Sequence, residues 1–379
     1  MIDSKKLFRI IENISAVVGF VTLPISMVLL FGKSDAWTIV LAVAVFLVSI
    51  AAIGAIVTAI ARRKNKAERF SGANSSQVAK NIANSLARTY NQGASDPNKY
   101  DTVILFGDSL LRPLYLGGCY DCYVRIALLI IKASQAKNNY LVQAKTYAGL
   151  GWMDIIFGNY DQAKQHIDEA IKIAQQQQNS ENTDETHRQK YLMVEAKARR
   201  HLLALYGYPD KREYHLKEYA KERKDLYELA NKLPDGIEKE IFLGGVVYGE
   251  AEYAFCREQY KKARELCQKA DRMRSNLNDN SRAVRFYAQM GKIELFDENP
   301  EKALGFFDNG YSASVGEDRI DEIVKNAYGK ACCWLLKNNA REAEKCLEDI
   351  RDYNGLRLAP NDYLIVKKYN SIKKTKGVD

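Results

Sequence analysis

Two cysteines three positions apart, Cys119 and Cys122, are the first residues whose spacing could support chemistry. Such a pair can form half of a zinc site or a redox-active disulfide. A structural zinc ion needs about four ligands, and no second pair of this kind and no paired histidines follow nearby. Cys122 also falls on the side of a helical stretch that is expected to be buried. We therefore predict that both cysteines are structural.

The other reactive residue types show no catalytic arrangement. The four histidines are scattered, without the HExxH spacing that places two imidazoles on one metal: His166, His187, His201 and His215. The sequence contains no GxxxxGK[ST] loop, no GxGxxG turn and no GxSxG elbow. Neighbouring carboxylates, Glu250 with Glu252 and Glu317 with Asp321, are predicted to lie on solvated surface. These observations predict that the protein is not an enzyme and binds no cofactor or metal.

The charge balance favours an anionic partner. The chain has 379 residues and a formal net charge of +9, which suits a lipid surface, an acidic peptide, a nucleotide or a nucleic acid, or serves membrane topology instead. Basic residues are spread around the predicted helices without a dense stripe, so nucleic acid is the less favoured partner. The seven cysteines, an odd number, are typical of buried thiols in a reducing compartment.

The elements that would position any site begin with two long uncharged stretches. Residues 13–32 and 36–61 contain no charged residue, and roughly 20 apolar residues suffice for a helix to cross a bilayer. Residues 1–66 are therefore predicted to form a transmembrane hairpin. Positive flanks stay in the cytoplasm, so we expect a two-span membrane protein with both termini cytoplasmic; the residues after the second stretch that fix this topology are Arg62, Arg63, Lys64 and Lys66.

Small residues in the second stretch favour close helix packing. Ala51, Ala55 and Ala59 lie four residues apart on one helix face, a spacing that lets two membrane helices approach closely. They are predicted to pack within the hairpin or between copies of the chain. Residues 67–98 are predicted to be a polar linker, in which residues 76–90 form an amphipathic helix that lies on lipid or packs on the first repeat.

From residue 99 to residue 379 the chain shows repeated helix pairs. The stretch LGWMDIIFGNYDQAKQHIDEAIKIA places small and large residues at fixed intervals: Leu150, Gly151, Gly158, Tyr160, Ala163, Ile167, Ala170 and Ile171. Equivalent positions recur at 123, 163, 263, 303 and 343, a step of 40 with one gap of 100. This arrangement resembles the tetratricopeptide repeat, a helix–turn–helix unit. The resemblance implies an all-α fold, an α-solenoid of about six helix pairs.

The same resemblance implies a concave binding groove lined by the first helix of each pair. Carried over repeat by repeat, the groove residues are Lys145, Trp152, Tyr248, Glu252, Arg285, Lys292, Lys325 and Tyr328. Their mixture of cations and aromatic residues suits an anionic partner, either an acidic protein segment or a small phosphorylated ligand such as a nucleotide.

Two functions follow from this layout. The first is a membrane-tethered scaffold or adaptor that gathers protein partners through the groove. The second is a regulated membrane effector, in which the repeats sense a peptide or nucleotide and drive the hairpins to assemble into a pore or a bilayer-disrupting cluster. The second layout resembles, in architecture alone, the two-span effectors of bacterial immune systems.

Overall fold

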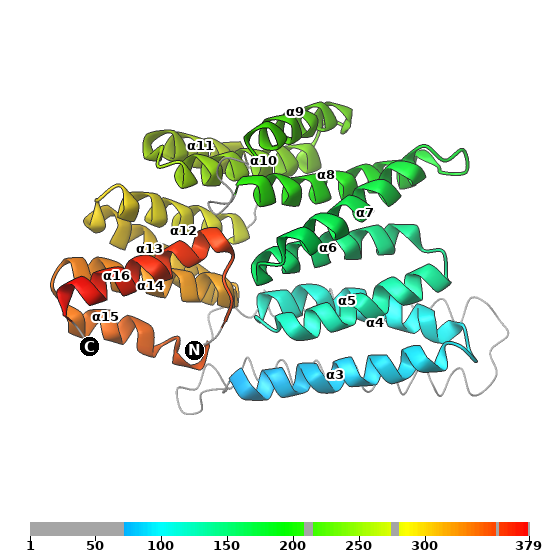
Figure 1. Ribbon diagram of the computed structural model, residues 1–379, viewed down its shortest axis with the longest axis horizontal. Coiled ribbons are helices and arrows are strands. Elements are labelled where there is room, and N and C mark those ends of the chain that lie inside the picture. The colour runs from blue at the N-terminus through cyan, green and yellow to red at the C-terminus, as the bar shows by residue number, and fades with distance from the viewer. Residues whose placement is uncertain (1–71, 208–214, 274–279, 354–355, 378–379) are drawn as a thin grey trace, which may run out of the picture. The chain divides into compact units, whose positions relative to one another are not determined.

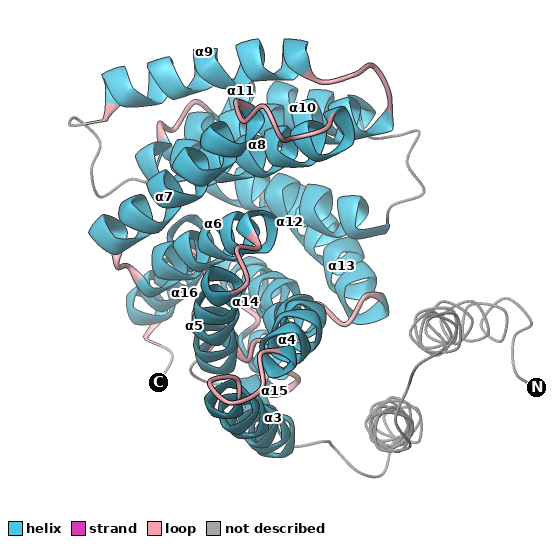
Figure 2. Ribbon diagram, turned by 90° about the vertical axis from the view of Figure 1, so that its right-hand side faces the viewer, coloured by secondary structure: helices cyan, strands magenta, loops and turns pink. Residues whose placement is uncertain are grey.

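The computed structural model describes residues 72–207, 215–273, 280–353 and 356–377, and these residues are helical without strands (Figures 1 and 2). The first half contains α3 (Gly72–Gln92), α4 (Asn98–Leu116), α5 (Tyr120–Ala136), α6 (Tyr140–Phe157), α7 (Tyr160–Gln178), α8 (Glu185–Gly207) and α9 (Leu216–Lys232). The second half contains α10 (Ile237–Cys256), α11 (Tyr260–Met273), α12 (Asn280–Phe296), α13 (Pro300–Gly316), α14 (Ile320–Leu336), α15 (Ala340–Glu348), the short 3-10 turn η2 (Arg351–Tyr353) and α16 (Pro360–Lys376). The predicted all-α class is confirmed for this part of the chain.

The turns between helices recur about every 20 residues and use one backbone conformation. The second residue after the helix, or the first in the case of Gly158, has a positive φ: Gly118, Asn138, Gly158, Glu258, Glu298, Asp318 and Asn338. The next amide then donates back into the helix; the amide of Asn139, for example, donates to the carbonyl of Ser134 over 2.8 Å. This bond satisfies a carbonyl that the helix end would leave without a partner. Identical turns explain the constant step seen in the sequence.

Apolar residues at helical spacing build the core. On α5, Tyr123, Ile126, Ala127 and Ile130 are buried, which is the i, i+3, i+4, i+7 stripe of a helix that packs on one side. Consecutive helices pack against each other from α3 to α15, and α6 with α8, α8 with α10, and α12 with α14 also touch. Packing between neighbours in sequence and between alternate helices is compatible with a helical solenoid.

Close helix contact depends on small residues in the second half. The ring of Phe307 on α13 is fully buried between Gly291 of α12 and Gly329 of α14. A Cβ atom at Gly291 would lie 2.7 Å from this ring, and a Cβ atom at Gly329 would lie 2.5 Å from it. Side chains at these two positions would meet the ring, so the close packing of the three helices depends on both glycines.

The last helix departs from the stacking order. Its principal neighbour is α14, although α15 precedes it in sequence. Buried side chains of α16 join the cluster that contains Leu295 of α12 and Cys332 of α14. The segment before it reaches the first helix pairs: the Leu356 side chain lies against Gly118, and the Arg357 guanidinium lies 4.8 Å from the ring centroid of Phe157.

The predicted membrane localisation is contradicted. Among the described helices, none is long and apolar enough to span a bilayer. The stretches 13–32 and 36–61 lie outside the described residues, as do the residues singled out there: Ala51, Ala55, Ala59, Arg62, Arg63, Lys64 and Lys66. The stretch predicted as a linker helix lies within α3, which packs against α4 and α5.

Candidate partner-binding face

The eight predicted groove residues fall into two groups. Lys145, Trp152, Tyr248, Glu252 and Arg285 retain contact with solvent on α6, α10 and α12. Lys292, Lys325 and Tyr328 lie beneath α16, with Lys292 0% and Lys325 5% exposed. We use the term inner face for the surface of α4, α6, α8, α10, α12 and α14 that carries these residues.

Asp362, in the first turn of α16, accounts for the burial of the two lysines. Its carboxylate lies 3.1 Å from the Nζ atom of Lys292 and 3.1 Å from the Nζ atom of Lys325. Lys325 also lies 2.8 Å from Glu322, and the Lys292 ammonium lies 4.9 Å from the ring centroid of Phe255. Buried ammonium groups need such partners, because an unpaired buried charge is strongly destabilising.

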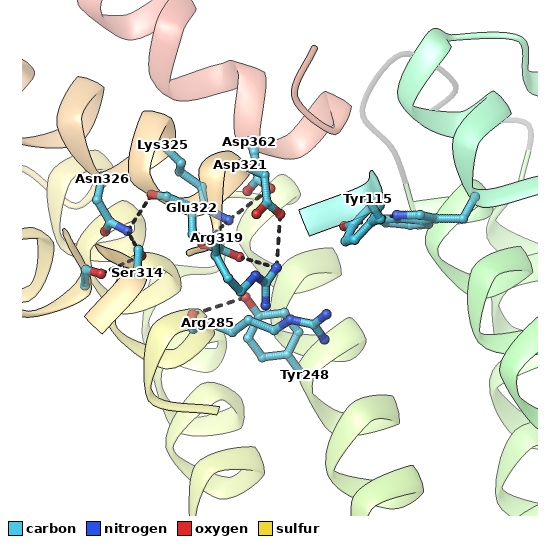
Figure 3. Close-up of polar contacts among 12 residues, drawn as sticks. Tyr115, Tyr248, Arg285, Ser314, Arg319, Asp321, Glu322, Lys325, Asn326 and Asp362 are labelled. Atoms are coloured by element: carbon cyan, nitrogen blue, oxygen red, sulfur yellow. Dashed lines mark hydrogen bonds and ion pairs between the residues drawn. The ribbon is translucent and has the colours of Figure 1, made fainter. Parts of the chain in front are cut away.

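The ion pairs continue to the start of α14. Arg319 lies 3.4 Å from Glu322 and 3.0 Å from Asp321, so charges alternate from Arg319 through Glu322 and Lys325 to Asp362 (Figure 3). Burial would raise the pKa of Asp362, but the ammonium groups of Lys325 and Lys292 outweigh it and lower that pKa to about 2. Asp362 is therefore ionised throughout the neutral range.

Apolar anchors complete the contact of α16 with the inner face. Ile365, Tyr369 and Ile372 are buried, and the ring of Tyr369 meets that of Tyr328 edge-on, with centroids 5.6 Å apart. Asn361 accepts a hydrogen bond from the Cys256 thiol over 3.0 Å. The helix thus touches α10, α12 and α14 and not only the last pair.

The other half of the inner face is built around aromatic residues. The Trp152 indole donates to the hydroxyl of Tyr115 over 3.4 Å, and its ring lies 5.2 Å from that of His201. His201 is buried and its Nδ1 atom lies 3.0 Å from the Ala148 carbonyl, so Nδ1 must be the donor. Burial lowers the pKa of His201, and Lys197 lowers it further. The imidazole is therefore neutral.

Cations surround this aromatic row. Burial lowers the pKa of Lys197, and the nearby charges of Arg200, Lys145 and Arg285 lower it further, while Asp108 opposes them. The Lys197 side chain is nevertheless exposed to solvent. Within the described part of the chain, Lys145, Lys197 and Arg285 form no ion pair with a carboxylate. This half of the inner face lacks the acidic partner that α16 supplies to the other half.

Sequence reasoning missed several of these residues. Lys197 and His201 lie on α8, within the gap of 100 residues in which the equivalent repeat positions do not recur. Asp362 lies in a helix that the repeat pattern does not reach, although its spacing to Ile365, Tyr369 and Ile372 is visible as a one-sided stripe. The prediction of solvated surface is wrong for Glu250, which is buried and paired with Arg223.

The described residues show little that could support catalysis or metal binding. His166 and Asp154 form a pair with 2.7 Å between Nδ1 and Oδ2, but no nucleophile is paired with them in the described structure. No group of three or more potential metal ligands occurs among the described residues. All seven cysteines are free, and burial raises the pKa of Cys119 and Cys122. A cavity beside Tyr248 and Arg285 has a volume of about 10 Å³, room for about one water molecule.

Comparison with known proteins adds no relative. No protein-family model matches the sequence, and no curated protein is similar enough to count as a match.

Proposed function

We propose that the described helical domain is an interaction module of an adaptor or scaffold protein, and that its inner face binds an acidic segment of a partner protein. The observation that carries this proposal is the set of cations around Trp152. Lys145, Lys197 and Arg285 come from three helices and share one surface without carboxylate partners among the described residues.

The electrostatics of this set favour an incoming anion. Arg200, Lys145 and Arg285 lie close enough to Lys197 for their charges to lower its pKa, and Asp108 opposes them. A carboxylate placed among these groups would relieve the repulsion, and charge-assisted hydrogen bonds are stronger than neutral ones. Asp108 and Glu252 also face this region, so the excess of cations is partial and favours a segment with spaced acidic residues.

The dimensions favour a peptide over a small molecule. Small-molecule pockets usually enclose about 300–1,000 Å³, whereas the cavity beside Tyr248 and Arg285 has about 10 Å³. The cations are instead distributed over α6, α8 and α12, which suits an extended ligand. Half-buried Tyr115 and Trp152 offer flat surfaces beside them, and such rings are frequent in peptide-binding interfaces.

As part of this proposal, we infer that the helix pairs are about six repeats of the tetratricopeptide type. It is supported by the 40-residue step and by the complete burial of the small residues that the pattern requires: Ala163, Ala263, Ala303 and Ala343. Repeats of this kind commonly present concave surfaces for extended partners.

A binding measurement tests the proposal. A fluorescein-labelled oligo-glutamate peptide is titrated with the full chain, and anisotropy gives Kd for the wild type and for the Lys197→Glu, Arg285→Glu double variant. Reversing two of the clustered cations should weaken binding by at least about tenfold, equivalent to about 1.4 kcal/mol. Higher salt should also weaken the wild-type complex, because surface charges are screened over about 10 Å at 0.1 M salt.

The matched control is the double variant Lys261→Glu, Lys262→Glu, which reverses two charges at exposed positions of α11. This variant should bind the peptide as the wild type does. Equal affinity of the wild type and the Lys197→Glu, Arg285→Glu variant would refute the proposal, as would equal losses in that variant and in the control.

A further inference from the structure

Helix α16 lies on the inner face in the way that a bound helical ligand would. It packs mainly against α14, and its side chains reach Cys256 of α10 and Lys292 of α12. Figure 1 draws it across α12 and α14 and not beyond α15. A helix that simply ended the solenoid would cover the exposed side of the last pair.

One face of α16 makes this contact. Asp362, Ile365, Tyr369 and Ile372 follow at intervals of three, four and three residues, so they lie on one side of the helix. All four contact the inner face. Asp362 forms ion pairs there, and the three apolar side chains are buried. The recognised pattern is therefore an acidic residue in the first turn followed by large apolar residues at +3, +7 and +10.

The inner face requires that acidic residue. Lys292 is completely buried, and Asp362 is its ion-pair partner at 3.1 Å. Lys325 shares the same carboxylate at 3.1 Å. Any helix that replaced α16 would have to bring a carboxylate to this place, because both ammonium groups would otherwise lose a partner in a buried setting.

Apart from Asp362, the charged residues of α16 have the wrong sign for this surface. Besides Asp362 it carries the five lysines Lys367, Lys368, Lys373, Lys374 and Lys376, so the helix has a formal charge of +4 (five lysines minus one aspartate). The cations Lys145, Lys197 and Arg285 lie on the same inner face. An acidic helix with the same four anchors would add attraction to these cations, which α16 with its excess of lysines cannot supply.

We propose that α16 is an internal ligand, and that the surface of α10, α12 and α14 beneath it binds an amphipathic helix of a partner protein. That helix carries an acidic first turn, large apolar residues at +3, +7 and +10 and more acidic than basic residues, and it displaces α16. The inference rests on the proposed function and deepens it, because it identifies the form and the contact pattern of part of the acidic partner.

Synthetic peptides and the full chain test this inference. The first peptide has the sequence of residues 358–377, the second replaces its five lysines with glutamate, and the third places lysine at the Asp362 position of the second. Each is labelled and titrated by anisotropy with the wild type, with Asp362→Lys and with Asp352→Lys. In the Asp362→Lys protein the new lysine faces Lys292 and Lys325, so α16 should leave the inner face. Asp352 lies exposed on η2 and provides the same charge change as a control.

The second peptide should bind Asp362→Lys at least about tenfold more tightly than it binds the wild type or Asp352→Lys, because α16 no longer competes. It should also bind at least about tenfold more tightly than the first and third peptides. Equal affinity for the three chains would overturn the inference. A wild-type dimer that the first peptide dissociates would assign the surface to a second copy, and would likewise overturn it.

Hydrogen exchange of the wild type tests the inference even if the Asp362→Lys protein misfolds. In the wild type, backbone amides of α16 should exchange with solvent at least about tenfold faster than those of α12 and α14, because α16 opens without them. If the backbone amides of α16 exchanged only at the rate of those of α14, the inference would be overturned. Loss of oligo-glutamate binding in Lys197→Glu, Arg285→Glu would still support the proposed function in that case, so the two failures are distinguishable.

Discussion

Replacement of Asp362 by asparagine should loosen α16 by an amount that the structure allows us to calculate. Asparagine keeps the shape of the side chain and removes its charge. Lys292 then loses its ion-pair partner, while Lys325 keeps Glu322 at 2.8 Å. The pKa of Asp362 falls from the usual 3.8 to about 2 in the folded chain. Because each pKa unit corresponds to 1.36 kcal/mol, the ionised carboxylate stabilises the docked helix by about 2 kcal/mol.

Hydrogen exchange followed by mass spectrometry measures this loss locally. A destabilisation of about 2 kcal/mol should accelerate exchange of the α16 amides by about 30-fold at neutral pH. Removal of one partner from a buried ion pair often costs more, about 3–5 kcal/mol, so larger effects are consistent with the same cause. Amides of α5 and α7 should exchange as in the wild type. Asp352→Asn, on the exposed η2 turn, is the matched control and should change nothing.

The dependence on pH gives the reasoning its sharpest test. The folded pKa of Asp362 lies below the unfolded value, so the stabilisation is fully present above about pH 3.8 and is lost as the pH falls through about 2. After correction for intrinsic exchange rates, the difference between the wild type and Asp362→Asn should therefore persist at pH 5 and disappear near pH 2. Identical exchange of the two proteins at neutral pH would refute the argument, and so would a difference that persists unchanged near pH 2.

Three further predictions concern the framework that carries the inner face. Glu258 and Glu298 have positive φ values of 59° and 60°, so Glu258→Gly and Glu298→Gly should each stabilise the chain by about 0.5–1 kcal/mol in urea unfolding; destabilisation would contradict the role of the turn conformation. Gly329→Ala should destabilise by about 1–3 kcal/mol, because the new methyl group meets the trapped Phe307 ring; an unchanged unfolding midpoint would contradict the close packing. Burial raises the pKa of the Cys333 thiol to about 12, so its alkylation at pH 8 should require opening of the fold and should accelerate steeply at denaturing urea concentrations, whereas rapid alkylation of the native protein would contradict its burial.

Local regularities made the fold predictable. The recurring step of 40 residues placed Ala163 and its counterparts at positions that the structure buries completely. The all-α class followed from the same pattern, because each element shows the spacing of one-sided helices. The turns were not foreseen in detail, since Glu258, Glu298 and Asp318 adopt a backbone conformation in which glycine or asparagine is usually found.

The site could be predicted only in part, because some of its residues meet partners that lie far away along the chain. Lys145, Trp152 and Arg285 were expected on the inner face from their position within a repeat. The burial of Lys292 depends on Asp362, which lies 70 residues away in a helix outside the repeat pattern. The expectation for the last helix of a solenoid is continued stacking, and nothing in local periodicity indicates that α16 turns back. Lys292 and Lys325, both predicted as groove residues, are therefore covered in the structure.

Lysine acetylation footprinting tests the central claim most directly, because it locates the bound segment on the wild-type chain. The protein is treated with a limiting amount of acetylating reagent, with and without saturating oligo-glutamate peptide, and modification is quantified by mass spectrometry. We predict that the peptide protects Lys145 and Lys197 and leaves the exposed Lys262 on α11 unchanged. Unchanged modification of Lys145 and Lys197, or equal protection of Lys262, would contradict an inner face that binds acidic partners.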